Sequence, residues 1–192
     1  MNIFQKNTKK ERVAVYIDGS NFYGYLKDEV ISFPKGVKFN FKGFVDFLVG
    51  DKRECISKRY YTGVFRNLDG SQKSESLVSG QQKFFSKLEN DGFKIKRGRI
   101  MPIGKTYKEK GTDVKIAVDL IVGAVDDIYD TAILVSSDTD LIPAIQYVKY
   151  KQKKIEYIGF AHAPSLGIQK YVNFSILLLP RDIEKFKENI LL

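Results

Sequence analysis

The sequence predicts an α/β domain in which a mainly parallel sheet is covered by helices. Short runs rich in β-branched and aromatic residues alternate along the chain with segments of helical periodicity, and this alternation is typical of parallel sheets. The first such run, VAVYI at 13–17, is continuously apolar, as expected of a strand that is buried on both faces. A length of 192 residues fits about one domain. We therefore expect a flexible basic tail over 1–11 and a single domain over 12–192.

The first half of the chain is expected to alternate between strands and helices. The segment 40–50 is expected to be a helix because apolar residues recur there at helical spacing. The segment 93–100 alternates apolar and basic residues, which is typical of a strand towards the edge of a sheet. The elements expected in this half are strands at 12–17, 58–65 and 93–100, helices at 40–50 and 81–90, and loops at 32–38 and 67–76.

The second half begins with a basic segment, 101–111, that we expect to be a flexible loop. Thr112 is a suitable N-cap for a helix that runs to about 125. Because this helix is apolar nearly all round, we expect it to be largely buried. The remaining expected elements are strands at 131–135 and 155–160, a candidate short strand at 176–179, a helix that begins at Ser137 or Asp138, and a final amphipathic helix at 181–190.

Composition limits the chemistry open to the chain. Lys and Arg number 32 against 23 Asp and Glu, and the net charge of +9 favours a polyanionic partner, nucleic acid first. A basic surface that only maintains solubility is the alternative. The chain has one cysteine, Cys55, and one histidine, His162, which excludes an intrachain disulfide and zinc sites built from His and Cys clusters. We expect a reducing, cytoplasmic location and no membrane contact, because no apolar run approaches about 20 residues.

Acidic residues occur where strands are expected to end. Asp18 directly follows VAVYI, and Asp138 and Asp140 follow AILVSS. Ligands of open α/β sheets bind at the carboxyl ends of the strands, near the point where the strand order reverses. Asp113 opens the apolar helix that follows Gly111, and Asp119 lies within this helix. Carboxylates that are held together repel one another and need a cation, so the pattern favours a site for Mg²⁺ or Mn²⁺.

Each of these acids also has an ordinary structural explanation. Asp18 can form a tight turn, and Asp138 can cap a helix. Asp113 suits the positive end of its helix. Asp119 stands four residues after Lys115, where an ion pair would explain it. The functional interpretation therefore depends on the joint occurrence of the acids at strand and helix ends, since no single acid requires it.

Three segments resemble, in this order, the signature blocks of the NYN domain family, in its LabA-like branch of the PIN-like nucleases: IDGSN at 17–21, KGTDVKIAVDL at 110–120 and SSDTDL at 136–141. The similarity spans about 12–160. One departure is Leu141, where the family often has Phe. The resemblance implies a Rossmann-like three-layer sandwich with a central, mainly parallel sheet of PIN-like type. It also implies an acidic Mg²⁺ or Mn²⁺ pocket and, in active members, metal-dependent endoribonuclease chemistry.

The resemblance implies roles for individual residues. The implied catalytic residues are Asp18, Asn21, Asp113, Asp138 and Asp140, and the implied metal ligands are Asp18, Asp113, Asp119 and Asp138. Asn21 can orient Asp18 or cap the helix that follows, and the two roles are compatible. The implied reaction is the hydrolysis of an RNA phosphodiester bond by metal-activated water. The alternative is a regulatory protein of the same fold that binds nucleic acid without cleaving it.

The densest positive stretch of the chain lies around 94–110. We expect Arg97, Arg99, Lys105 and Lys110 to contact RNA, since lysine and arginine neutralise phosphates. Solvated side chains without a nucleic-acid partner are the alternative. A homodimer is also a candidate assembly, because PIN-like relatives often pair.

Overall fold

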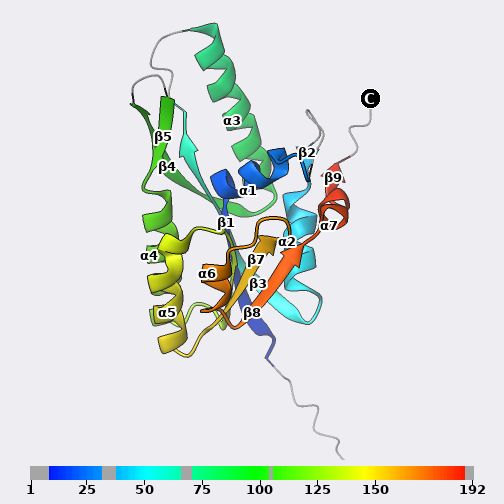
Figure 1. Cartoon of the computed structure of the whole chain (residues 1–192), viewed down its shortest axis with the longest axis vertical. Helices are drawn as coiled ribbons and strands as arrows, with labels where there is room; N and C mark the ends of the chain where they lie inside the picture. The colour runs from blue at the N-terminus through cyan, green and yellow to red at the C-terminus, as the bar shows by residue number, and fades with distance from the viewer. Residues whose placement is uncertain (1–8, 32–37, 66–70, 104–105, 189–192) are drawn as a thin grey trace, which may run out of the picture.

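The computed structural model describes residues 9–31, 38–65, 71–103 and 106–188. A seven-stranded sheet forms its centre, with the strand order β5-β4-β3-β1-β6-β7-β8 (Figure 1). All neighbouring strands are parallel except β5, which runs antiparallel to β4. The strands are β1 (Glu11–Asp18), β3 (Arg53–Val64), β4 (Phe93–Ile103), β5 (Thr106–Lys110), β6 (Thr131–Val135), β7 (Lys154–Phe160) and β8 (Phe174–Leu178). Within the described residues, no helix is long and apolar enough to cross a membrane.

The parallel strands have the order of a doubly wound Rossmann-like sheet. The chain first builds outward from β1 through β3 to β4, then returns to the other side of β1 with β6, β7 and β8. The direction of winding therefore reverses between β1 and β6, which is where such sheets bind ligands. β1 and β6 are paired along Val13–Ile17, so the residues that follow both strands emerge side by side at one edge of the sheet.

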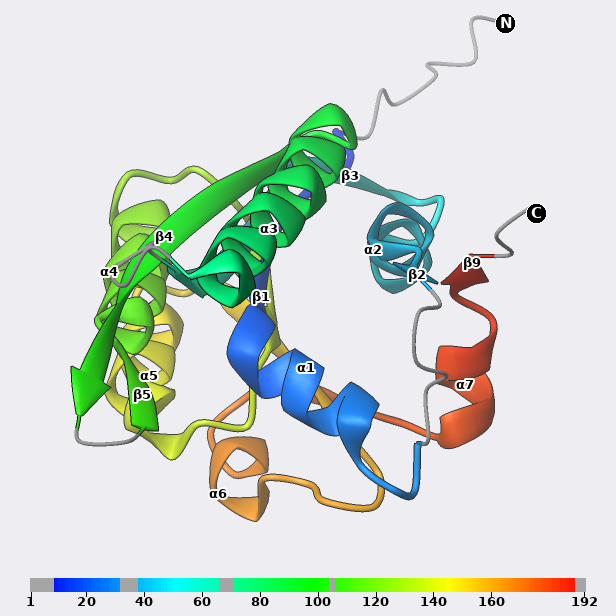
Figure 2. The ribbon, with the colours of Figure 1, turned by 90° about the horizontal axis from the view of Figure 1, so that it is seen from above.

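Helices cover both faces of this sheet, as the view from above shows (Figure 2). The helices are α1 (Gly19–Lys27), α2 (Phe41–Val49), α3 (Gln72–Asn90), α4 (Thr112–Val125), α5 (Ile142–Tyr150), α6 (Leu166–Gln169) and α7 (Pro180–Glu184), with a short 3₁₀ turn, η1, at Thr139–Leu141. β2 (Lys38–Phe39) and β9 (Lys187–Glu188) form a separate two-stranded antiparallel sheet.

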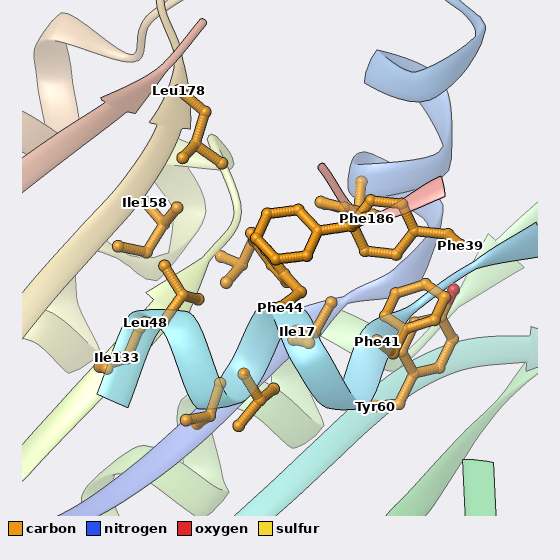
Figure 3. Close-up of a cluster of buried hydrophobic side chains, with 14 of the residues drawn as sticks. Ile17, Phe39, Phe41, Phe44, Leu48, Tyr60, Ile133, Ile158, Leu178 and Phe186 are labelled. Carbon is orange, nitrogen blue, oxygen red and sulfur yellow. The ribbon is translucent and has the colours of Figure 1, made fainter. Parts of the chain in front are cut away.

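The two faces of β1 belong to two different cores. Val13, Val15 and Ile17 join a cluster with α1, α2, α7 and part of α3, in which phenylalanine side chains crowd together around Phe44 (Figure 3). Ala14 and Tyr16 face the second cluster, formed with α4, α5 and α6. Alternate residues of a strand point to opposite faces, so a continuously apolar strand is the expected centre of a three-layer sandwich. The predicted Rossmann-like sandwich is confirmed.

Several predicted boundaries near the edge of the sheet are wrong. The segment 101–111, expected to be a loop, supplies the end of β4 and all of β5, which form an antiparallel hairpin. This strand escapes prediction because it is charged rather than apolar, as exposed edge strands often are. β3 begins at Arg53 rather than 58, and α3 begins at Gln72, inside the expected loop 67–76. β1 begins at Glu11, one residue inside the expected tail.

Two predicted helices also differ from the structure. α4 ends where expected, but Gly111 rather than Thr112 is its N-cap, and Thr112 is its first residue. Only one face of α4 is buried, so the expectation that it is largely buried is also wrong. The helix expected over 181–190 is limited to Pro180–Glu184, and β9 follows it. Phe186 interrupts the helical pattern because its ring packs against Phe39 and Phe44, so tertiary packing outweighs local periodicity.

Candidate metal and nucleic-acid site

Asp18 lies at the carboxyl end of β1 and is almost completely buried, with an exposed fraction of 5%. It caps α1 by accepting a hydrogen bond from the backbone N–H of Asn21 (3.1 Å), and it accepts another from the hydroxyl of Ser136 (3.0 Å). Burial raises its pKa to about 6, and these hydrogen bonds only partly oppose the increase, while the nearby charges of Asp113 and Glu109 add to it. Asp18 is therefore a carboxylate whose charge the folded chain does not balance.

Asn21, in the first turn of α1, forms hydrogen bonds with Ser137, which follows β6, and with Asp18 at the end of β1. Its side-chain amide donates to the hydroxyl of Ser137 (3.1 Å), and its carbonyl oxygen accepts from the backbone N–H of Ser137 (3.1 Å). Tyr25 donates to the same hydroxyl (2.6 Å). The side chain of Asn21 thus joins α1 to the residue that follows Ser136, and its backbone N–H donates to Asp18, so the predicted positioning of Asp18 by Asn21 is compatible with this geometry. The other predicted role is wrong, because Asp18 caps α1 and Asn21 lies within its first turn.

Asp138 and Asp140 follow β6, on the opposite side of the reversal point. Asp138 caps η1 by accepting from the backbone N–H of Asp140 (2.9 Å). Its own backbone N–H donates to the hydroxyl of Ser136 (3.2 Å), which in turn donates to Asp18. Ser136 therefore links Asp18 and Asp138. Asp138 caps η1 and also lies beside the acidic site.

Asp113 occupies the first turn of α4, where the helix dipole favours a charged carboxylate. Its pKa is nevertheless raised, by partial burial and by the negative charges of Asp138, Glu109 and Asp140. Asp113 therefore lies within range of the charges of Asp138 and Asp140, which follow β6, and its own charge acts on Asp18 at the end of β1. The structure therefore brings these predicted acids into one electrostatic neighbourhood.

Glu109 is a site residue that sequence reasoning missed. It lies on β5 and accepts hydrogen bonds from the hydroxyls of Ser20 in α1 and Thr112 in α4. Its negative charge raises the pKa of both Asp18 and Asp113. In sequence, Glu109 is one acid inside a lysine-rich run, and only the pairing of β5 with β4 brings it to the site.

The donor chemistry of this neighbourhood suits a hard divalent cation, because every acid present offers carboxylate oxygens. The distances do not form a finished centre: in the part of the chain that the structure describes, no three His, Cys, Asp or Glu side chains lie close enough to hold one metal ion. Asp18, Asp113 and Asp138 are thus close enough for their charges to affect one another's pKa. They are not close enough to form a complete set of metal ligands.

The carboxylate of Asp119 interacts with residues outside this acidic site. Its carboxylate accepts from the hydroxyl of Tyr61 (2.7 Å) and pairs with Arg59 (3.1 Å) and Lys96 (3.0 Å). Partial burial raises its pKa, but the hydrogen bonds and these two cations outweigh burial and lower the pKa below its usual value. The expected pair with Lys115 is wrong, since Lys115 donates to the backbone oxygen of Arg97. Asp119 already has its cations and needs no metal.

The predicted RNA-contact residues lie on the β4–β5 hairpin. Arg99 and Lys110 are exposed and stand directly opposite each other in the two strands. Like charges directly opposite destabilise a strand pair, so this pair favours a negative partner. Arg97 packs over the ring of Phe85 in α3, with Glu89 at 3.5 Å. Lys105 lies outside the described residues.

Comparisons with known proteins agree with this fold. A family model described as the NYN domain matches residues 12–174. A crystal structure of a protein of unknown function from Vibrio parahaemolyticus superposes with a TM-score of 0.69 at 20% sequence identity, covering 95% of this chain and 99% of that chain. At this identity the likeness extends to the fold alone. No curated protein matches the chain.

Proposed function

Because the chain belongs to the NYN domain family, whose fold is that of the PIN-like nucleases, we propose that it hydrolyses RNA phosphodiester bonds with the help of Mg²⁺ or Mn²⁺. The observation that carries this proposal is Asp18, a buried carboxylate with a raised pKa beside other acids at the reversal point of the sheet. A structural role alone would favour a neutral residue at this buried position, whereas a cation-binding role requires the acid.

Asp18, Asp113 and Asp138 are the residues that would hold the ion, directly or through water, with Asp140 and Glu109 close by. When bound, the ion would neutralise the repelling carboxylates and lower the pKa of a water molecule. The remaining task of the chain is to hold the acids in place. Ser136 and Asn21 do this through the hydrogen bonds that fix the ends of β1 and β6.

Arg99 and Lys110 would bind the phosphates of the substrate. They lie on the same hairpin as Glu109, but on the opposite face of β5, because Lys110 and Glu109 are consecutive residues of the strand. RNA bound to the hairpin would have to cross the exposed edge of β5 to reach the acidic site. The net charge of +9 would accelerate the approach of the polyanion to the protein.

The proposal is tested by incubating end-labelled single-stranded and hairpin RNA with the protein in Mg²⁺, in Mn²⁺ and in EDTA. We expect internal cleavage that requires a divalent ion and is lost in Asp18→Asn and in Asp138→Asn. Asp46→Asn is the matched control, because Asp46 is an exposed acid on α2 that pairs with Lys42. Cleavage that survives both site variants would overturn the assignment of the site.

A second candidate function is RNA binding without cleavage, as in a regulator. It is favoured by one observation, the lack of three converging ligands among the described residues. The same assay separates the two functions when RNA binding is measured in parallel. A protein that binds RNA but leaves it intact with either metal is the regulator.

A further inference from the structure

The last turn of α5 presents two tyrosine rings to solvent. Tyr147 and Tyr150 have exposed fractions of 38% and 75%, and their ring centroids lie 5.9 Å apart. Tyrosines that serve the core of this protein are buried completely, as Tyr129 and Tyr157 are. Packing within the chain therefore does not explain why two large rings stand together at this point of the surface.

Lysine side chains accompany these rings. The ammonium of Lys151 lies 5.6 Å from the ring centre of Tyr147 and 5.7 Å from that of Tyr150. Both distances are close to the outer limit of about 6 Å for a cation–π contact, so the ammonium leaves Tyr150 open to solvent. Lys149 is exposed on the same turn, and neither lysine forms an ion pair with a described residue. Lysines at a helix end favour the helix dipole, but this role leaves the exposed tyrosines unexplained.

We infer that Tyr147, Lys149, Tyr150 and Lys151, here called the tyrosine platform, bind single-stranded RNA, with bases stacked on the rings and phosphates held by the lysines. Every base has a π face, so aromatic rings beside cationic side chains bind single strands without reading their sequence. The choice of RNA over DNA rests on the proposed function. The stacking itself requires neither the acidic site nor a metal ion.

Other partners fit the platform less well. In a double helix the bases are stacked on one another and paired, so they are not available to the rings. A protein partner would use the tyrosines, but lysine is depleted from the centre of protein interfaces, whereas Lys151 lies over both rings. The net charge of +9 also favours a polyanion. A single strand uses both the rings and the charges.

The platform lies at the far end of α5 from the acidic site. α5 begins directly after η1, which contains Asp140, and ends at the amino ends of the strands, away from α1 (Figure 1). Its nine residues span about 13 Å, or about four nucleotides at a stacked spacing of about 3.4 Å. Pro143, Gln146 and Tyr150 are exposed on one face of α5. A strand that follows this face from the platform reaches the acidic site after about four nucleotides.

Fluorescence anisotropy with an oligouridylate of about 12 nucleotides tests the platform, in EDTA so that metal-dependent cleavage is absent. Tyr147→Ala with Tyr150→Ala should weaken binding at least about tenfold, while circular dichroism shows an unchanged fold. Tyr147→Phe with Tyr150→Phe keeps the rings and should bind like the wild type. Phe174→Ala, which removes a comparably exposed ring on β8, should also leave the affinity unchanged. Equal affinity of the wild type and the double alanine variant overturns the inference.

Salt dependence separates stacking from simple charge attraction. Lys149→Ala with Lys151→Ala should reduce the slope of log affinity against log salt by about 1.4, the value for two phosphate contacts to a single strand. The double tyrosine-to-alanine variant should keep the wild-type slope, because stacking releases no counterions. A duplex should bind equally to the wild type and to this tyrosine variant. A changed slope, or a loss of duplex binding, in the tyrosine variant contradicts stacking.

The failure of this inference is distinguishable from the failure of the proposed function. If the tyrosine variant binds less RNA and the wild type cleaves none with either metal, the platform stands and the nuclease proposal fails. If the wild type cleaves RNA and the tyrosine variant binds as tightly as the wild type in EDTA, the nuclease proposal stands. The platform is then rejected as an RNA site, and its rings are left for a protein partner.

Discussion

The hydroxyl of Ser136 donates a hydrogen bond to Oδ2 of Asp18 at 3.0 Å, where the ends of β1 and β6 meet. Both residues are buried. The same hydroxyl accepts from the backbone N–H of Asp138, so one small side chain sets the positions of two acids that are far apart in sequence. The bond favours the charged form of Asp18, yet it does not offset the effect of burial on its pKa.

We predict that the stability of the protein falls as pH rises through the titration of Asp18. The folded pKa is about 6 against an ordinary value of 3.8, so between about pH 4 and pH 6 the folded state binds more protons than the unfolded state. The free energy of unfolding should drop by roughly 3 kcal/mol over this window from this group alone. Asp18→Asn lacks this titration and should be more stable than the wild type at about pH 8.

Urea unfolding of both proteins at several pH values checks this prediction. Because other acids titrate in both proteins, the quantity to follow is the difference between variant and wild type, which should grow from about pH 4 to pH 7. Added Mg²⁺ should stabilise the wild type at the upper end and leave Asp18→Asn unaffected. A difference that is constant with pH contradicts the assigned pKa.

Asp119 and Asp113 should respond in opposite ways to the same substitution. Asp119→Asn weakens the contacts with Arg59, Lys96 and Tyr61, so we expect a loss of about 1–3 kcal/mol in unfolding free energy with the Mg²⁺ response retained. Asp113→Asn removes repulsion and should retain or gain stability while it loses the Mg²⁺ response. Thermal unfolding with and without Mg²⁺ measures both effects. If Asp119→Asn also loses the stabilisation by Mg²⁺, the prediction is contradicted and Asp119 is a metal ligand after all.

Substitution of two glycines of α1 by alanine should change the free energy of unfolding in opposite directions. A Cβ at Gly19 would lie 2.5 Å from the ring of Tyr60, whereas a Cβ at Gly24 would meet no atom within 4 Å. We expect Gly19→Ala to cost about 1–3 kcal/mol, because the crowded ring and α1 must move apart. Gly24→Ala should gain about 0.5–1 kcal/mol from helix propensity. Urea unfolding compares them, and similar effects of the two substitutions would contradict this packing.

The strand-end acids could be predicted from sequence because their signals are local. A continuously apolar run followed by Asp18, and another followed by Asp138, identify strands and the edge at which they end. Parallel strands place both acids at the same edge of the sheet, and the pairing of β1 with β6 then makes them neighbours. The alternation alone predicts a parallel sheet covered by helices, and the Rossmann-like architecture was implied by the resemblance to the NYN domain family.

Contacts that depend on pairing between distant strands could not be predicted. Glu109 reaches the site only because β5 folds back on β4. Asp119 was expected to pair with Lys115 by helical spacing, but Arg59 on β3 and Lys96 on β4 lie closer to its carboxylate. The solvent-facing valines of α4 are another case, since periodicity cannot separate a helix buried all round from one that is apolar on its outer face.

The hairpin provides the last prediction, which concerns RNA binding. Arg99 and Lys110 face each other across β4 and β5, and a phosphate bound between them would relieve their repulsion. Arg99→Ala with Lys110→Ala should weaken binding of single-stranded RNA and reduce the slope of log affinity against log salt by about 1.4, as expected for two phosphate contacts. The unfolding free energy should stay the same or rise slightly, because like charges have been removed. Lys52→Ala with Lys94→Ala is the matched control, since Lys52 directly precedes β3 and Lys94 lies near the start of β4, and both are exposed. Fluorescence anisotropy titrations at several salt concentrations measure the slope, and equal slopes for the two double variants would show that the hairpin does not bind the RNA backbone.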